Sequence, residues 1–114
     1  MKRTAAVAAA LFCTLAGSEA NASSTGPSTV TVVLSATAGF AMFEVDGQRS
    51  PRPSCGAAFP TRFAFNITTP AGQAMLSTLL TAATAHKSIV VWGSGACDQP
   101  TPDTEGVLYI EMRP

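Results

Sequence analysis

Few residues in this sequence of 114 residues could perform acid–base chemistry. His86 is the only histidine, and it stands at the end of a predicted helix, where a cation complements the negative end of the helix dipole. Glu44 and Asp46 lie two apart on a predicted strand and so face one side, but they border a turn, which favours a solvated face over a catalytic carboxylate pair. Because a hydrolytic triad needs a nucleophile, a base and an orienting group, we expect no catalytic residues and a protein that is not an enzyme.

The segment Gly93-Ser94-Gly95 follows a predicted strand, as a nucleotide-binding loop would. The full fingerprint needs a third glycine at the opening of a helix, and Ala96 and Cys97 follow instead. A tight turn that presents Cys97 to a partner explains both glycines. A metal site is also not expected, because two cysteines and one histidine fall short of the usual ligand sets. The sequence therefore predicts no cofactor and no metal.

Trp92 and Tyr109 are the only tryptophan and the only tyrosine, and both lie on predicted strands near loops. Aromatic rings with a polar end serve binding surfaces, and sugar rings commonly stack on them. Plain packing in the core is the other interpretation, and the residues by themselves leave both open. We take Trp92 and Tyr109 as candidate ligand-binding residues.

The first residues predict a secretory signal peptide over 1–22. The basic start Met1-Lys2-Arg3 is followed by the apolar run 4–15 and then by Ala20-Asn21-Ala22, an A-x-A cleavage signal before Ser23. A helix that spans a membrane needs about 20 apolar residues, so we expect cleavage and no membrane anchor. Cleavage two residues earlier is the alternative. The mature protein is expected in the periplasm or outside the cell.

Removal of the signal peptide leaves an almost neutral chain with two cysteines. Five basic and six acidic residues remain, so the net charge is −1. Such a chain lacks the basic footprint of proteins that bind nucleic acids or anionic membranes, and we expect neither partner. Because an oxidising compartment favours pairing of an even number of cysteines, we expect a disulfide between Cys55 and Cys97.

The rest of the sequence predicts a flexible leader and one domain. Residues 23–29 are small and polar throughout, which is typical of the leader, and the domain covers 30–114. Alternating or β-branched apolar runs predict strands, and an apolar stripe behind Thr69-Pro70 predicts a helix. The strands are expected at 30–34, 40–46, 62–67, 89–92 and 107–112, and the helix at 71–86. This mainly β order, β-β-β-α-β-β, is typical of a small, partly open OB-like barrel. An open antiparallel sheet with one packed helix is the alternative.

The predicted helix has two distinct faces. Its apolar stripe, expected to lie on the barrel, consists of Met75, Leu76, Leu79, Leu80 and Ala83. Its opposite face is polar but carries no charge, which is unusual for a helix in contact with water. That face consists of Gln73, Ser77, Thr78, Thr81 and Thr84.

From Cys55 to Asp98 the sequence resembles a group of small exported bacterial proteins of unassigned function. The resemblance is carried by the strings C-x6-R-F-A-F-x3-T-P-x-G-x3-L-x2-L-L-x-A and I-V-V-W-G-S-G-A-C-D and by the later Glu105. More distantly, the strand order is similar to that of the B subunits of AB5 toxins, of the subtilase-cytotoxin and pertussis-like type. Those subunits are OB folds that form pentameric rings, bind glycans and line a central pore with their helices. The resemblance implies a homo-oligomer in which the uncharged helix face lies in the contact.

These observations together favour an exported binding module that is not an enzyme. We expect it to be oligomeric and to bind a glycan. A periplasmic structural or inhibitor-like domain that acts through a protein partner is the alternative.

Overall fold

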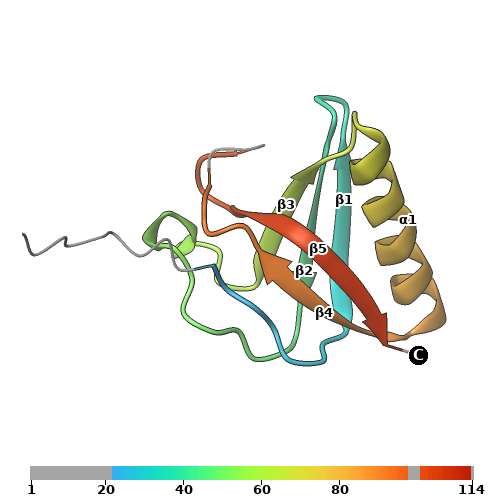
Figure 1. Ribbon diagram of the computed structural model, residues 1–114, viewed down its shortest axis with the longest axis horizontal. Helices are drawn as coiled ribbons and strands as arrows, with labels where there is room; N and C mark the ends of the chain where they lie inside the picture. The colour runs from blue at the N-terminus through green and yellow to red at the C-terminus, as the bar shows by residue number, and fades with distance from the viewer. Residues whose placement is uncertain (1–21, 98–100, 114) are drawn as a thin grey trace, which may run out of the picture.

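The structure is a computed structural model in which residues 22–97 and 101–113 are described, and these contain five strands and one α-helix (Figure 1). The predicted signal peptide, apart from Ala22, lies outside the described residues. The elements are β1 (Val30–Ala36), β2 (Phe40–Val45), the 3-10 turn η1 (Ser54–Gly56), β3 (Arg62–Asn66), α1 (Pro70–Ala85), β4 (Ser88–Gly93) and β5 (Glu105–Arg113). The predicted order β-β-β-α-β-β is confirmed, as is the mainly β class.

The strands form one mixed sheet in the order β1-β2-β3-β5-β4. Three of the pairings are antiparallel, and β3 pairs with β5 in parallel. Within the described residues the sheet is open, with β1 and β4 as its edges, and does not close into the expected barrel. The alternative, an open antiparallel sheet with one packed helix, is correct in its open sheet and its helix. It is wrong only in the β3–β5 pairing, which is parallel.

The outer edge of β4 is covered by residues 23–29, which were expected to be a flexible leader. Ser28 and Ile89 exchange two backbone hydrogen bonds of 2.9 and 2.8 Å. The N–H of Thr25 donates to the carbonyl of Val91 at 3.0 Å, and the N–H of Val91 donates to the hydroxyl of Thr25 at 3.0 Å. In the structure these hydrogen bonds hold the segment that the sequence predicts to be a flexible leader. Its small polar side chains fit between β4 and the loop after β2 and satisfy backbone groups there.

The hydrophobic core lies between the inner face of the sheet and α1, which packs against β1, β4 and β5 (Figure 1). Phe43 stacks on Phe63 with ring centroids 5.6 Å apart and meets Phe65 edge-on at 6.0 Å. Aromatic pairs of this kind add to the stabilisation from burial alone. The buried members of the core are Ala41, Phe43, Val45, Phe63, Phe65, Leu79, Ala82, Ile89 and Val91.

The start of α1 follows the local signals that the sequence carries. The Thr69 hydroxyl accepts a hydrogen bond of 3.0 Å from the N–H of Gly72, and Pro70 occupies the first helical position. Gly72 is buried against the end of β3, where a Cβ atom would lie only 1.8 Å from the carbonyl oxygen of Asn66. The helix ends at His86, which has the left-handed φ of 53°. A glycine at position 72 is thus required for α1 to approach the sheet.

The face of α1 that meets the core differs in one position from the expected stripe. Leu79 and Ala82 are buried, and Met75 and Leu76 pack against the core. Leu80 is 45% exposed. At about 100° per residue, position 80 is rotated away from the line that runs through 75, 79 and 82, so Leu80 leaves the core and Ala82 takes its place.

Candidate ligand-binding surface

Trp92 and Tyr109 form a stacked pair on the β4–β5 ribbon. They stand opposite one another in the antiparallel register, with ring centroids 5.6 Å apart and planes inclined by 26°. Trp92 is 38% exposed and Tyr109 is 46% exposed. The structure therefore brings both candidate residues together and leaves their aromatic surface in contact with solvent. We call this pair the aromatic platform.

The alternation of β4 explains why the indole faces outward. Ile89 and Val91 are fully buried in the core, so Trp92, the next residue, projects from the opposite face of the sheet. Val90 shares that outer face and is only 6% exposed. The platform thus continues an apolar surface whose inner part is already covered.

Two charged side chains on β5 border the platform. The indole Nε1–H of Trp92 donates to Glu111 Oε1 at 3.2 Å, and Arg113 Nη2 lies 2.7 Å from Glu111 Oε2. The side chains of Arg113 and Glu111 are 58% and 37% exposed. The hydrogen bond orients the indole ring, and the exposed guanidinium and carboxylate supply donors and acceptors beside an aromatic face.

The uncharged polar face of α1 is on the surface as expected. Gln73, Ser77, Thr81 and Thr84 are exposed and Thr78 is half-buried. The hydroxyls of Thr78 and Thr81 donate to the carbonyl oxygens of Ala74 and Ser77, four residues earlier, at 3.2 and 2.8 Å. Because such bonds satisfy the hydroxyls within the helix, the face offers fewer free polar groups than its sequence indicates.

A groove of about 300 Å³ lies at the N-terminal end of α1. Asn66, Thr69 and Ser94 provide its polar groups, and Phe65, Met75 and Val107 are among its apolar walls. None of the described residues that line it is titratable. The groove offers hydrogen bonds and apolar contacts, and no group for proton transfer.

The other residues that could do chemistry have structural positions. His86 is exposed and ends α1, as expected. Asp46 Oδ1 accepts a hydrogen bond of 2.8 Å from the N–H of Thr29 and so joins the start of β1 to the end of β2. Gly93 lies directly over Glu105, where a Cβ atom would be 1.9 Å from Oε2. Gly93, the last residue of β4, thus makes room for a carboxylate.

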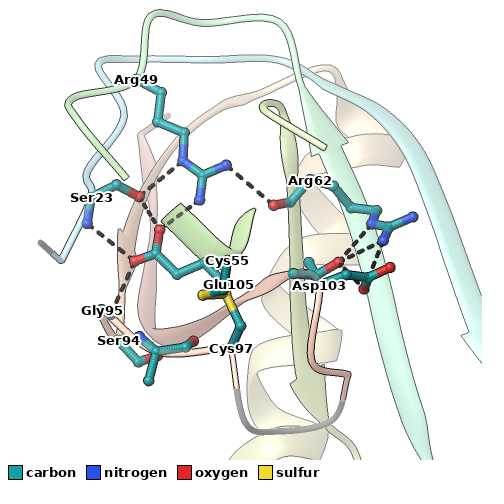
Figure 2. Close-up of a disulfide and its surroundings, with 11 residues drawn as sticks. Ser23, Arg49, Cys55, Arg62, Ser94, Gly95, Cys97, Asp103 and Glu105 are labelled. Carbon is teal, nitrogen blue, oxygen red and sulfur yellow. Dashed lines mark hydrogen bonds and ion pairs between the residues drawn. A yellow bond between two sulfur atoms is a disulfide. The ribbon is translucent and has the colours of Figure 1, made fainter. Parts of the chain in front are cut away.

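The predicted disulfide is confirmed. Cys55 lies in η1 and Cys97 follows β4, and their Sγ atoms are bonded, with Cα atoms 6.1 Å apart (Figure 2). Cys97 is buried, and Gly56 beside it packs beneath the backbone of Glu105. The bond ties the loop before β3 to the loop after β4.

Next to the disulfide lies a buried polar cluster that the sequence did not predict. Glu105 is fully buried and accepts hydrogen bonds from Arg49 Nη2 at 2.6 Å, from the N–H of Ser23 at 3.1 Å and from the N–H of Gly95 at 3.0 Å (Figure 2). The Ser23 hydroxyl donates to the same carboxylate. Both Arg49 and Glu105 come from segments that the sequence marks only as polar loops, so no local signal identified them.

The guanidinium of Arg49 makes hydrogen bonds at its edges and contacts an aromatic ring with its face. Besides Glu105, it donates to the hydroxyl of Ser23 at 2.9 Å and to the carbonyl of Pro60 at 2.8 Å, and its Cζ lies 3.9 Å from the centroid of the Phe63 ring. Burial lowers the pKa of Arg49, while the hydrogen bond and charge of Glu105 raise it, and the net shift is downward. The cluster resembles a structural anchor because each of its polar groups already has a protein partner.

A second arginine extends this side of the domain. Arg62 donates to Thr104 Oγ1 at 2.6 and 2.9 Å and pairs with Asp103 at 3.1 Å, and its guanidinium lies 3.4 Å from the centroid of the Phe59 ring. Partial desolvation raises the pKa of Asp103, but the hydrogen bond from Thr104 and the charge of Arg62 lower it, and the net shift is downward. These contacts fix the start of β5 against β3.

Among residues 22–97 and 101–113 there is no group of three or more His, Cys, Asp or Glu side chains that could hold a metal ion. In the same part of the chain, no helix is long and apolar enough to cross a membrane. Comparison of the chain with protein-family models, with curated proteins and with solved structures finds no match.

Proposed function

We propose that this protein is an exported binding module without enzymatic activity, and that its aromatic platform binds a glycan. The observation that carries the proposal is the stacked, exposed pair Trp92–Tyr109. The pair consists of the only tryptophan and the only tyrosine of the chain, and both rings keep a large exposed area. Such a pair is typical of a surface that is covered by a ligand.

The surroundings of the platform favour a sugar over a purely apolar ligand. The C–H face of a pyranose ring stacks on an indole or phenol ring, and its hydroxyl groups need donors and acceptors at the rim. Arg113 and Glu111 provide these on the same strand as Tyr109. The ribbon therefore combines an apolar floor with polar groups that can orient a ligand.

We also propose that the protein is a homo-oligomer and that the uncharged face of α1, with Gln73 and Thr81, is the contact between its copies. Both side chains are exposed, so this face is free to meet a second copy. A single mass for the monomer by light scattering at high protein concentration would contradict the oligomer.

The proposed function is tested by a glycan array probed with the oxidised mature protein, followed by calorimetry with each sugar that binds. Trp92→Ala and Tyr109→Ala are expected to weaken binding at least tenfold. Leu108→Ala is the matched control, because Leu108 is a 62% exposed apolar residue next to Tyr109 and outside the stacked pair. Absence of binding across the array, with the protein folded, would refute the proposal. Equal loss in all three variants would also refute it.

A second candidate is a domain that acts through a protein partner. It is favoured by Val32 and Leu34, each 47% exposed on the edge strand β1. Exposed apolar side chains on a strand edge are typical of a surface that another chain covers. Capture of one defined protein from a periplasmic extract, lost in Val32→Thr/Leu34→Thr and retained in Trp92→Ala, would favour this candidate.

A further inference from the structure

Ser23 is anchored by every polar atom that it possesses. It is 1% exposed, whereas Ala22 before it is exposed. Its N–H and hydroxyl both donate to the carboxylate of Glu105, its hydroxyl accepts from Arg49, and its carbonyl oxygen accepts a hydrogen bond of 2.7 Å from the N–H of Gly93. Burial thus changes sharply from Ala22 to Ser23.

The change in burial between Ala22 and Ser23 coincides with a cleavage signal in the sequence. Ala20-Asn21-Ala22 marks the bond between Ala22 and Ser23 as the substrate of a signal peptidase. On the C-terminal side of this bond, the nitrogen of Ser23 is buried and lies 3.1 Å from Glu105 Oε2.

We propose that the Ala22–Ser23 bond is a processing site and that the α-ammonium group created there forms a buried ion pair with Glu105. Hydrolysis consumes one water molecule: its oxygen joins the carbonyl carbon of Ala22, and the nitrogen of Ser23 leaves as an amine that is protonated in water. The nitrogen already lies within ion-pair distance of Glu105, so cleavage turns an amide donor into a charged one without moving the chain.

The surroundings of Glu105 allow its carboxylate to pair with an ammonium group at Ser23. The side chain of Glu105 is fully buried, and the missing side chain of Gly93 leaves space for the carboxylate. Arg49 Nη2 donates to Oε1 at 2.6 Å, while the N–H groups of Ser23 and Gly95 both donate to Oε2. The two cations therefore approach different oxygens of one carboxylate. The amide N–H already donates to an ionised acceptor, and an ammonium group would add the attraction between opposite charges, so processing should tighten the cluster.

The alternative cleavage after Ala20 leads to a different result. It would leave Asn21 and Ala22 attached, and the ammonium group would lie two residues away from Ser23. The Ser23 nitrogen would then remain an amide, as in the precursor. The two processing sites are distinguishable by one property, which is whether the α-amino group is buried.

The first experiment measures that property. The full precursor is expressed with its signal peptide, the protein is purified from the periplasm, and its intact mass defines the first residue. The folded protein is then treated with an amine-reactive reagent near neutral pH. Because Lys2 and Lys87 are the only lysines, a protein that begins at Ser23 has two amines, and the exposed Lys87 is an internal reference.

An accessible α-amino group reacts faster than a lysine at this pH, because it ionises about two to three pH units lower. We expect the α-amino group of the Ser23 form to react at least tenfold more slowly than that of a chain released by a tag protease to begin at Asn21. Lys87 should react equally in both. A first residue other than Ser23, or equal α-amino reactivity in the two chains, would overturn the proposal.

A second experiment isolates the charge. Acetylation of the Ser23 amine keeps an N–H donor at this position and removes the charge, and the exposure of Ala22 shows that an acetyl group has room. A Lys87→Arg background confines the reaction to Ser23. We expect the denaturation midpoint to fall on acetylation, and to fall less in Glu105→Gln. If Glu105→Gln does not fold, the acetylated protein and the free-amine protein are compared alone. Identical midpoints would overturn the proposal.

Discussion

Arg49 and Glu105 are separated by 56 residues in the sequence, yet Nη2 of one lies 2.6 Å from Oε1 of the other. The two side chains are 5% and 0% exposed. Neither charge can exchange its partner for water, so the pair fixes the loop between β2 and β3 to the start of β5. Removal of Arg49 breaks this buried ion pair and leaves the carboxylate of Glu105 without its guanidinium partner.

Arg49→Ala should therefore destabilise the oxidised mature protein by about 3–5 kcal/mol, the usual cost of breaking a buried ion pair. Arg113→Ala is the matched control, because Arg113 pairs with Glu111 on the surface and such pairs contribute about 0–1 kcal/mol. Denaturant unfolding followed by circular dichroism measures both. Similar losses in the two variants would contradict the structural role of Arg49.

Replacement of Cys55 and Cys97 together by serine should cost about 2–4 kcal/mol, because the bond closes a loop of 42 residues in the unfolded chain. Thermal or denaturant unfolding of the variant beside the parent gives the value. Peptide mapping without reductant should recover the Cys55–Cys97 cross-link from the exported protein in full. Two free thiols, or a covalent dimer as the main species, would be incompatible with this structure.

His86→Gly should stabilise the protein by about 0.5–1 kcal/mol. His86 adopts φ of 53° at the end of α1, a conformation that glycine adopts without a steric cost. The greater freedom of glycine in the unfolded chain offsets part of the gain. His86→Ala keeps the Cβ atom and should show no such gain. A lower melting temperature for the glycine variant than for the alanine variant would argue against the left-handed end of the helix.

Tyr109→Ala should shift the fluorescence emission of Trp92 to longer wavelength, because it removes the ring that stacks on the only indole in the chain. The loss of the aromatic pair should cost about 0.5–1.5 kcal/mol beyond the buried area. Emission and near-ultraviolet circular dichroism report the change. Leu108→Ala should leave the emission unchanged, and a shift of the same size there would show that it does not come from stacking.

The lowered pKa of Asp103 makes its contribution to stability depend on pH. Burial raises this pKa, but Thr104 and Arg62 lower it more, so the folded protein binds the proton less tightly than the unfolded chain. The contribution is present above the ordinary pKa of about 4 and is lost as the pH falls through the lower value of the folded state. Asp103→Asn should thus lower the melting temperature at neutral pH and have a smaller effect near pH 2. An equal effect at both would contradict the assignment.

The predictions from sequence succeeded where neighbouring residues decide the outcome. Thr69-Pro70 determines where α1 begins. The alternation over 62–66 predicts a strand regardless of which other strand pairs with it. Pairing of Cys55 with Cys97 required only that two cysteines remain. The parallel partner of β3 depends on contacts across about 40 residues, and no local pattern indicates it. The strand order alone therefore could not distinguish the expected partly open barrel from an open mixed sheet.

Two features of the structure were not predicted from the sequence, and for the same reason. They are the hydrogen bonds of residues 23–29 and the buried polar cluster. Small polar residues have the composition of a flexible segment, and Ser23 and Thr25 were judged on composition alone. Their burial is possible because Glu105, Arg49 and the edge of β4 provide partners for their polar groups. Composition shows which polar groups a segment carries, but it does not show which partners those groups have in the folded protein.

Ser23 and Glu105 are 82 residues apart, and residues 23–29 lie against β4 near the other end of the chain. In the proposed export, a polypeptide crosses the membrane from its N-terminus, so Ser23 emerges before Glu105. Residues 23–29 have their partners only when β4 and β5 have crossed. The contacts that hold Ser23 can therefore form only after residue 105 has been translocated, although Ser23 itself crosses early.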